Sequence, residues 1–381
     1  MISIQPYFLT FRGGLHLGTR GVNLEEAGVN LPSDTLFSAM LDIWRRNGGS
    51  PQAFAAPFCA PSPDPPFLLT SAFPYAGKVR FYPKPVDLSR LFTPDSLRER
   101  GKALKRIGYL SEGLLRRALQ GERLDAWLYP ADEYVEPQTG VALQGGRFWL
   151  TMDEFDQLPA SMKALAAGQR HGLRRHAVYG SSRTPRVTVD RSNASSTIFH
   201  AGRITFAEEC GLWFGVAELR TGALVEGTST NYADALRYIL ALLQDDGIGG
   251  ERTTGYGAFT VRRSEEAVDL PAPQPGNAVL LLSRYHPRPD ELPSALHAGR
   301  AAYSMTAVSG WLRSPDSVAQ RRKRLYLIEE GSIVCPPNAI AGDVADVRPE
   351  YAEGPTFPHP VYRFGLALAV DAGQLGETNY A

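Results

Sequence analysis

A glycine-rich stretch between a predicted helix and a predicted strand constrains this chain more than any other feature. Residues 247–259 read GIGGERTTGYGAF, with five glycines in the first eleven positions. Each glycine costs backbone entropy on folding and brings no side chain to a core. The stretch must therefore turn sharply, or let another group approach its backbone closely. The polar residues at its centre, Arg252, Thr253 and Thr254, suit an anionic partner.

The order helix, loop, strand excludes the common nucleotide-binding motifs. A P-loop and a dinucleotide fingerprint both run strand, loop, helix, so that a helix N-terminus faces the phosphate. Here the loop leaves a helix C-terminus, which carries partial negative charge. Arg252 also stands where the third glycine of a dinucleotide fingerprint belongs, and no Lys-Ser/Thr pair follows. Phosphates at this loop would have to be held by backbone amides and Arg252.

Composition narrows the function classes further. The chain has 40 Lys and Arg and 40 Asp and Glu, so any basic surface for nucleic acid must be local. Cys59, Cys210 and Cys335 are odd in number and far apart, which argues against a disulfide framework and for a reducing compartment. No signal pattern or long apolar run occurs, so we expect a cytoplasmic protein that does not span a membrane.

The periodicity of apolar residues predicts an α+β protein. Residues 1–265 give strand, helix, strand, a long insertion at about 78–203, then strand, helix, strand. This is the split ferredoxin-like (RRM-like, βαββαβ) arrangement, a four-stranded sheet with two helices on one face. The predicted strands are 3–11, 67–73, 212–219 and 258–263, and the helices start at Ser33 and span 233–243.

A second domain is expected after a proline-rich segment. Residues 266–277 contain Pro271, Pro273 and Pro275 and are typical of a linker. Residues 278–381 hold strand-like segments at 279–283, 324–329, 332–334 and 362–370, and we interpret them as a second ferredoxin-like domain.

Sequence motifs for catalysis or metal binding are absent. The chain has no C-x-x-C, no H-E-x-x-H and no G-x-S-x-G, and its seven histidines are scattered. We therefore expect no catalytic residue, no metal and no cofactor. One alternative stays open: His16, in a glycine-rich loop after the first strand, could act as a general base.

Two basic segments are candidates for phosphate contact. The window 170–191 contains a single carboxylate, Asp190, and its segment 186–191 alternates like one arm of a hairpin. Guanidinium groups match phosphate oxygens, although a solvated face or a protein contact is also open. A second run at 97–107 is helical, and here too solvent surface is an alternative. The basic residues are Arg170, His171, Arg174, Arg175, His176, Arg183, Arg186 and Arg191 in the first segment, and Arg98, Arg100, Lys102, Lys105 and Arg106 in the second.

Four motifs in this order give the chain a family resemblance. Residues 32–39 (PSDTLFSA), 81–85 (FYPKP), 185–191 (PRVTVDR) and 247–259 resemble motifs of the RAMP superfamily. More closely, they resemble the Cas-five-like subunit of type III-A CRISPR (Csm) complexes that caps the 5′ end of the CRISPR RNA. Residues 310–311, 330–333 and 359–365 match its C-terminal half.

The resemblance implies a non-catalytic RNA-binding subunit of an antiviral ribonucleoprotein. It would grip the 5′ handle of the crRNA and dock the large polymerase-like subunit and a backbone RAMP subunit. In the glycine-rich loop, the amides of Gly249, Gly250 and Gly255 would approach the RNA. Together with the chemistry of the residues themselves, this gives the candidate RNA-binding set: Gly247, Gly249, Gly250, Arg252, Thr253, Gly255, Tyr256 and Gly257 in the loop, Arg174, Arg175, Arg183, Arg186 and Arg191 in the basic window, and His16, Ser33 and Lys84. Arg174 and Arg175 match no motif of the family.

Some of these assignments have an ordinary structural alternative. Tyr256 could stack on a base or be a core residue at the end of a strand. Ser33 could bind a phosphate or simply cap the first helix. Two other functions also stay open, a RAMP endoribonuclease that uses His16 and a protein-only scaffold. Under the capping hypothesis, Gly250→Asp or Arg252→Glu would abolish guide retention and leave the fold intact.

Overall fold

An antiparallel sheet assembled from distant segments forms the centre of the molecule. The computed structural model describes residues 1–18, 27–59, 62–166, 168–189, 196–297, 299, 301–314, 317–338, 340–349, 357 and 359–376. The first strand, β1 (Ile2–Phe11), lies between β12 (Cys210–Glu218) and β13 (Phe259–Arg263). Both β4 (Phe67–Leu69) and β5 (Phe73–Ala76) pair with the far side of β12. The order β13-β1-β12-β5, all antiparallel, is the one expected of the predicted βαββαβ unit.

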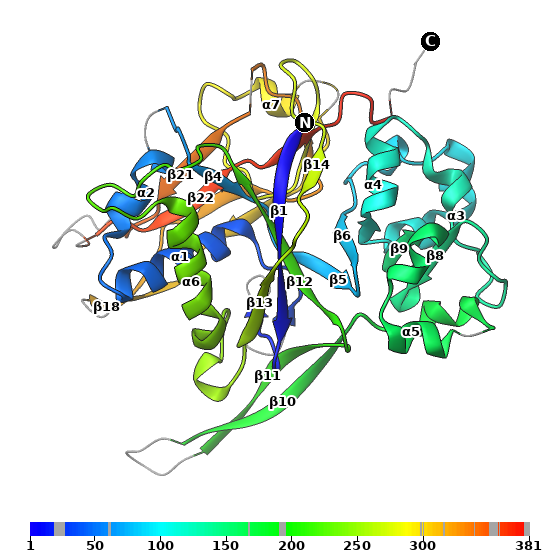
Figure 1. Cartoon of the computed structure of the whole chain (residues 1–381), viewed down its shortest axis with the longest axis horizontal. Helices are drawn as coiled ribbons and strands as arrows, with labels where there is room; N and C mark the ends of the chain where they lie inside the picture. Colours follow the sequence, from blue (N-terminus) through cyan, green and yellow to red (C-terminus); the bar gives the residue numbers. More distant parts are fainter. Residues whose placement is uncertain are drawn as a thin grey trace.

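Two helices pack together beside this sheet (Figure 1). They are α1 (Ser33–Arg46) and α6 (Tyr232–Asp246). Helix α6 begins where the Asn231 side chain accepts a 2.8 Å hydrogen bond from the Asp234 amide. Its buried residues Ile239 and Leu240 lie three and four positions after Leu236, so the three share one face of the helix. This apolar stripe is the pattern that predicted the helix. A further helix, α2 (Pro51–Cys59), was not expected, because Pro57 lies inside it.

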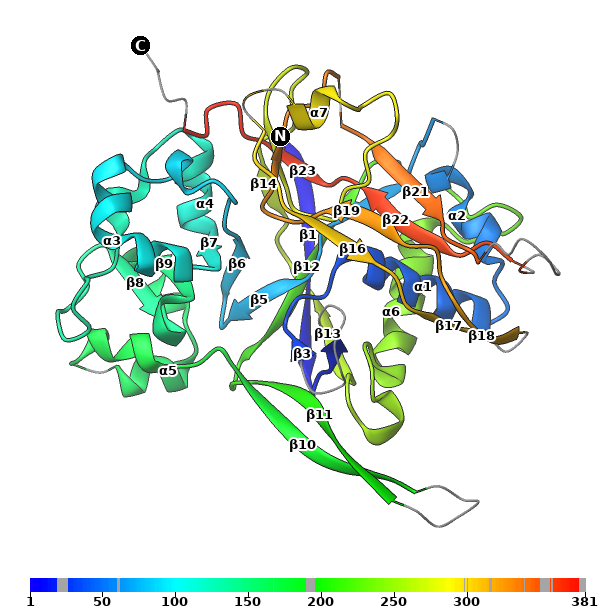
Figure 2. The ribbon, with the colours of Figure 1, turned by 180° about the vertical axis from the view of Figure 1, so that it is seen from behind.

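The insertion folds as a lobe that continues the same sheet. Strand β6 (Val79–Pro83) pairs with β5 and β7 (Tyr109–Ser111), followed by β9 (Phe148–Thr151) and β8 (Gly140–Leu143). We call residues 79–175 the insertion lobe; it lies to one side of the molecule in Figures 1 and 2. Its helices are α3 (Pro94–Arg106), α4 (Glu112–Leu119) and α5 (Ala160–Leu165), with 3-10 turns η1 (Leu88–Arg90), η2 (Leu124–Trp127), η3 (Gln144–Gly146), η4 (Met152–Gln157) and η5 (Arg170–Arg175).

A long hairpin follows the lobe and projects away from the body of the protein (Figure 2). Strand β10 (Tyr179–Val189) pairs with β11 (Ser196–Phe206) in an unbroken antiparallel register from Tyr179–Phe206 to Val189–Ser196. The alternation at 186–191 therefore predicted this arm correctly. At the base, Leu15 and Ile204 exchange backbone hydrogen bonds, which ties the hairpin to the segment that follows β1. That segment continues into the short pair β2 (Leu17–Gly18) and β3 (Ala27–Gly28).

The C-terminal third differs from the expected second ferredoxin-like domain. Its described residues form several small antiparallel sheets instead of one four-stranded sheet covered by two helices. The reason is that these strands pack on the N-terminal region rather than on helices of their own. The elements are β15 (Val279–Leu281), β20 (Ile333–Val334) and β23 (Ala369–Asp371) in one sheet, the pairs β16 (Met305–Val308) with β19 (Leu325–Ile328), β17 (Trp311–Ser314) with β18 (Ser317–Arg321) and β21 (Gly342–Asp346) with β22 (Tyr362–Leu366), and helix α7 (Ser294–His297).

The segment expected to be a linker is part of the central sheet. Residues 268–270 form β14 (Val268–Leu270), which pairs with Ile2–Ile4 of β1. One hydrophobic core also runs through both regions: Phe364 of β22 packs on Phe37 of α1, with ring centroids 4.7 Å apart. The two parts of the chain therefore share one interior.

A buried polar junction joins α1 to the C-terminal strands. Asp34 accepts a 2.8 Å hydrogen bond from Arg363, with side chains only 2% and 10% exposed. Ser33 is fully buried, and its hydroxyl accepts a 3.0 Å hydrogen bond from the Arg284 amide. Pro32, not Ser33, is the N-cap of α1. Ser33 is thus neither a helix cap nor exposed to RNA, because tertiary packing has placed it inside the junction.

Candidate nucleic-acid interface

The glycine-rich loop packs closely on the segment that follows β1. Gly249 has φ +94°, and a side chain there would place its Cβ 2.4 Å from the His16 carbonyl oxygen. Gly257 has φ +82°, and its Cβ would lie 2.1 Å from the carbonyl oxygen of Ile248. Both positions combine a left-handed backbone with a backbone neighbour, and only glycine satisfies both conditions. At these two positions, glycine allows the loop backbone to pack directly against other backbone segments of the same chain.

Backbone hydrogen bonds fix the loop in this position. The Gly250 amide donates to the His16 carbonyl at 2.8 Å, and the Gly257 amide donates to the Gly14 carbonyl at 2.8 Å. The Gly255 amide donates to the Arg252 carbonyl within the 3-10 turn η6 (Arg252–Thr254). The amides of Gly250 and Gly255, expected to contact RNA, are therefore already used by the fold.

The exposed part of the loop is its tip. Residues 252–255 are all exposed, whereas Tyr256 and Gly257 are buried. Arg252 forms an ion pair with Asp246, and Asp246 also accepts hydrogen bonds of 2.8 and 2.7 Å from Arg46. The Arg46 guanidinium, and then that of Arg252, hold the pKa of the Asp246 carboxyl below its ordinary value. Since the Arg252 side chain is 43% exposed, it can still offer N–H groups to a phosphate.

Two arginines of the hairpin meet the loop at a tyrosine. The guanidinium carbons of Arg186 and Arg203 lie 5.0 and 5.8 Å from the centre of the Tyr256 ring. The Tyr256 hydroxyl is 3.2 Å from the Thr184 hydroxyl, and Arg186 lies 3.7 Å from Glu251. We call Arg186, Arg203 and Tyr256 the arginine–tyrosine cluster. It joins β10, β11 and the loop in one place.

The cluster carries more positive charge than the described carboxylates neutralise. Only Glu251 forms an ion pair with it among those residues, and the Nε atoms of Arg186 and Arg203 are buried without a partner there. Partial burial acts to raise the pKa of Tyr256, but its side-chain interactions with Thr184 and Arg186 and the charge of Arg186 outweigh burial and lower the pKa. Two guanidinium groups that share a single carboxylate among the described residues attract a further anion.

Tyr256 itself is a packed residue. Only 8% of it is exposed, and its ring lies beneath the two guanidinium groups. Of the two interpretations that its sequence context allowed, the structure favours the packed one in this conformation. Tyr256 holds the arginines in place and is covered by them.

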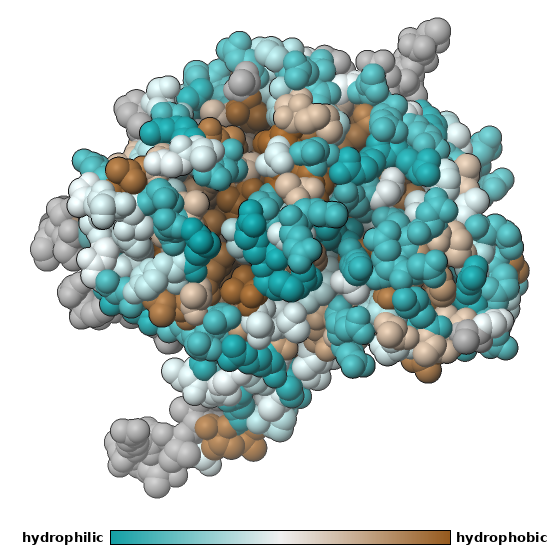
Figure 3. Space-filling view, viewed as in Figure 1, coloured by the Kyte–Doolittle hydropathy of each residue, from teal (hydrophilic) through white to brown (hydrophobic). Residues whose placement is uncertain are grey.

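The outer part of the hairpin presents a different chemistry. Val187 and Ile198 are cross-strand partners, 57% and 67% exposed, and an apolar patch is visible near the end of the hairpin in Figure 3. Exposed apolar side chains on a projecting arm suit the faces of bases or an apolar partner surface. Arg183 is exposed on β10. Arg191 lies outside the described residues.

His16 is a structural residue here. It is 4% exposed, and its Nδ1 lies 2.8 Å from the carbonyl oxygen of Gly202 on β11. A side chain at Gly250 would place its Cβ 2.8 Å from His16 Cδ2. His16 therefore supports the loop from below and does not face a substrate. For the same reason Gly250→Asp would disturb the fold, contrary to the expectation from sequence.

The remaining predicted residues lie elsewhere. Lys84 is half-buried between the insertion lobe and the C-terminal strands, where its Nζ donates to the Leu104 carbonyl at 3.3 Å. Burial lowers the pKa of Lys84 to about 8, as expected for an ammonium group without a carboxylate partner. Arg174 and Arg175 belong to η5 of the insertion lobe. None of the three contacts the loop or the arginine–tyrosine cluster.

Arg203 is a candidate site residue that sequence reasoning missed. It lies on β11, opposite Ser182, and approaches Gly14 so closely that a Cβ there would be 2.7 Å from its Nε. The basic segment identified from sequence, residues 170–191, ends before β11, the strand that carries Arg203. Continuing the hairpin register through its second arm would have placed Arg203 on a strand beside Arg183.

Replacing Gly257 with alanine is expected to destabilise the loop far more than replacing Gly255. Both have positive φ, +82° and +86°, but a Cβ at 255 meets nothing within 4 Å. Gly255→Ala should cost about 1 kcal/mol, the penalty of the backbone conformation alone. Gly257→Ala should cost about 3 kcal/mol or more, since the Ile248 carbonyl must move. Urea unfolding and limited proteolysis of both variants check this, and equal losses would contradict it.

Other kinds of site find no support within the described residues. No group of three or more His, Cys, Asp or Glu side chains converges there as a metal site would require. In the same residues, no helix combines the length and apolar character needed to cross a bilayer.

Comparison with known proteins points to one family. Residues 274–372 match the model of the CRISPR Csm4 C-terminal domain. Over 357 residues, 93% of both proteins, the chain is 28% identical to the CRISPR system Cms protein Csm4 of Mycobacterium tuberculosis. It is 31% identical over 153 residues to the protein of that name from Thermococcus onnurineus, which covers 39% of this chain and 43% of that protein.

Solved structures share the fold. A chain of the Csm3-Csm4 subcomplex of the type III-A CRISPR-Cas interference complex superposes with a TM-score of 0.60 at 15% identity, covering 96% of this chain and 99% of that one. A chain of the Csm1-Csm4 cassette in complex with pppApA gives 0.51 at 18% identity, covering 99% and 100%. The resemblance inferred from the motifs is confirmed.

Proposed function

We propose that this chain is a member of the Csm4 family and serves as a non-catalytic, RNA-binding subunit of a type III-A CRISPR effector complex. It binds the 5′ handle of the crRNA at the glycine-rich loop and the hairpin, in the cytoplasm. By analogy with the solved Csm3-Csm4 and Csm1-Csm4 assemblies, it docks a backbone subunit and the large subunit. Its N-terminal sheet serves as the ferredoxin-like platform of a RAMP protein.

The arginine–tyrosine cluster is the observation that carries this proposal. Arg186 and Arg203 come from different strands of the hairpin, yet both rest on Tyr256 of the loop. Guanidinium groups that lie over an aromatic ring can still donate hydrogen bonds from their edges to phosphate oxygens. Arg252, on the exposed tip of the same loop, adds a third cation. A strand of RNA lying between loop and hairpin would contact all three.

The proposal is supported by what a single-stranded RNA needs. Splayed bases require apolar or aromatic faces, and the backbone requires cations in a line. The hairpin offers Val187 and Ile198 toward its end and the arginines nearer its base. This arrangement binds and orients RNA without a general base, since His16 is buried beneath the loop.

One binding experiment tests the proposal. The purified chain, without added metal, is titrated into labelled RNA with a repeat-derived 5′ handle and into a scrambled handle. We expect uncut complexes, tighter binding of the native handle, and weaker binding by Arg252→Glu. The logarithm of the binding constant should fall with the logarithm of salt concentration by about 0.7 for each phosphate contact.

The other outcomes identify the alternatives. Site-specific cleavage of the RNA would show a processing endoribonuclease and overturn the assignment as non-catalytic. No binding at low salt would leave a scaffold that meets its neighbours through protein contacts alone.

A further inference from the structure

Two basic segments that the proposed interface does not use come together in the insertion lobe. Helix α3 and the turn η5 approach each other at residues 129–133, where Arg100 and Arg174 both lie over the Tyr129 ring. A hollow of about 320 Å3 lies between Arg106 and η5, and a second hollow of about 550 Å3 lies along α3; the two share Ala131. The carboxylates among their lining residues are Glu99 and Glu133. We call this surface the basic groove; its cations are Arg98, Arg100, Lys102, Lys105, Arg106, Arg174 and Arg175.

Two guanidinium groups that lie over a buried tyrosine form the floor of the groove. The guanidinium carbons of Arg100 and Arg174 lie 5.3 and 5.2 Å from the centre of the Tyr129 ring. Tyr129 is 2% exposed, and its hydroxyl finds no hydrogen-bond partner among the described residues. In the same part of the chain, Nε and Nη2 of Arg100 are buried and also lack a partner. The floor therefore presents unused donors.

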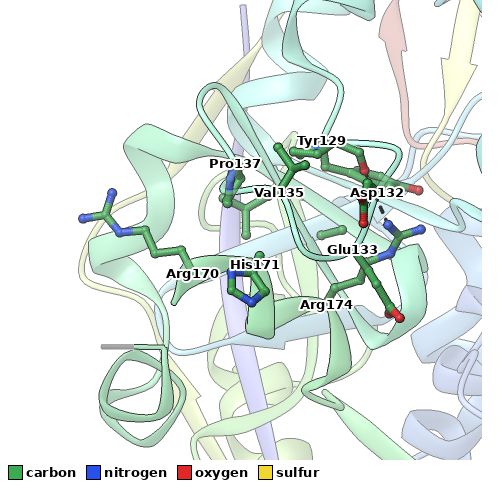
Figure 4. A pocket seen from close by; sticks show the side chains of 11 residues that line it. Tyr129, Asp132, Glu133, Val135, Pro137, Arg170, His171 and Arg174 are labelled. Atoms are coloured by element: carbon green, nitrogen blue, oxygen red, sulfur yellow. Dashed lines mark hydrogen bonds between the residues drawn. The ribbon is translucent and has the colours of Figure 1, made fainter. Parts of the chain in front are cut away.

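Arg174 is held so that it points toward this tyrosine. Its Nη1 donates to the Ala131 carbonyl at 3.1 Å, and Figure 4 shows it reaching from η5 toward the segment that bears Tyr129, Asp132 and Glu133. Within the described residues neither Arg174 nor Arg100 has a carboxylate within 4 Å, whereas Arg175 lies 3.6 Å from Glu133. Burial, and then the charge of Arg174, lower the pKa of Arg100. Arg100 and Arg174 repel each other across the Tyr129 ring, and a bound anion near both would relieve that repulsion.

The outer wall of the groove is equally rich in cations. Lys102, Lys105 and Arg106 are exposed on α3, and no described carboxylate lies within 4 Å of any of them. Arg106 donates to the Gly145 carbonyl at 3.3 Å, which anchors it beside the smaller hollow. A row of exposed cations above a buried guanidinium pair is a surface for an extended polyanion.

We propose that the basic groove binds the phosphate backbone of a second stretch of single-stranded RNA, separate from the stretch held at the glycine-rich loop. This rests on the proposed RNA-binding function and extends it. Turn η5 leads directly into β10, so a strand that leaves the arginine–tyrosine cluster along the hairpin reaches the groove at the hairpin base. RNA fits better than an acidic protein segment, because stacked guanidinium edges and aligned lysines contact a regularly charged backbone.

The test compares two RNAs and three variants of the full chain. One RNA is the 5′ handle alone, and the other is the same handle with an unstructured 3′ tail. Lys102→Glu/Lys105→Glu changes only exposed positions of the groove, and Arg174→Gln removes one charge from its floor. Lys78→Glu/Lys163→Glu makes the same two charge reversals outside the groove and serves as the matched control.

We expect the tail to tighten binding to the wild-type chain, and the groove variants to remove that gain. Lys102→Glu/Lys105→Glu should weaken binding of the long RNA roughly tenfold and reduce its salt slope by about 1.4, at about 0.7 per phosphate. Binding of the handle alone should not change in any groove variant, and the control should bind both RNAs as the wild type does.

Three results would overturn the inference. They are a tail that adds no affinity, groove variants that bind the long RNA as tightly as the wild type, and groove variants that keep both RNAs but lose an acidic protein partner in a pull-down. The proposed function stands or falls separately, on whether the handle alone binds and depends on Arg252.

Discussion

The double variant Arg186→Glu/Arg203→Glu is expected to lose handle RNA by about 100-fold or more in affinity at moderate salt. Both side chains rest on Tyr256, and their buried Nε atoms have no partner among the described residues. The substitutions remove two cations and place two new carboxylates near Glu251. An RNA strand would then meet a cluster of like charges. Fluorescence anisotropy over a salt series measures the change, and the salt slope should fall as well.

Two controls separate charge from folding. The double variant Arg220→Glu/Arg237→Glu makes the same reversals at exposed positions near the other end of the central sheet, and it should bind as the wild type does. Arg186→Gln/Arg203→Gln removes the two positive charges without adding carboxylates, and it should lose less affinity. If the reversal variant is folded by circular dichroism and still binds handle RNA normally, the cluster is not the RNA site.

Asp34→Ala is expected to lower the free energy of unfolding by about 3–5 kcal/mol. Its partner Arg363 is only 10% exposed and would be left as an uncompensated charge inside the protein. Urea unfolding at neutral pH measures the change. Asp42→Ala is the matched control: Asp42 lies on the same helix and pairs with Arg45 and Arg46, but at 42% exposure. That change should cost about 1 kcal/mol or less.

Replacing both partners distinguishes a lost ion pair from a lost packing contact. In Asp34→Leu/Arg363→Met neither charge of this pair remains, so most of the lost stability should return. A double variant as unstable as Asp34→Ala would show that shape, not charge, dominates at this junction. Neither substitution touches the loop, so RNA binding measured on the folded fraction should stay unchanged.

Local sequence patterns predicted the elements that carry the proposed interface. Helix α6, the glycine-rich loop and β13 are consecutive, and each has its own signal: an apolar stripe, five glycines, and alternation. The hairpin arm at 186–191 followed from alternation alone. Because these signals depend on neighbours within a few residues, the sequence contains them directly.

The role of a side chain could not be predicted from the local sequence where it depends on a residue distant in the chain. Ser33 looks like a helix cap in its local context, yet the amide that it accepts belongs to Arg284. The sequence could not decide whether Tyr256 stacks on a base or packs inside the protein, because Arg203, which covers its ring, is distant in the chain. The prediction of a second ferredoxin-like domain differs from the structure for a related reason. Strand patterns show where the C-terminal strands lie in the sequence, but not that a strand such as β22 packs on α1.

The edge of the central sheet has a consequence for assembly. Beyond β1 the sheet ends in two short strands, with β14 beside Ile2–Ile4 and β13 beside Tyr7–Phe11. Strand β13 also carries the exposed Arg262 and Arg263. Short, charged edge strands disfavour β-augmentation, in which another chain adds a strand to the sheet. Under the proposed function, a neighbouring subunit that meets this edge would join it through side chains, and the same edge disfavours pairing between copies of this chain.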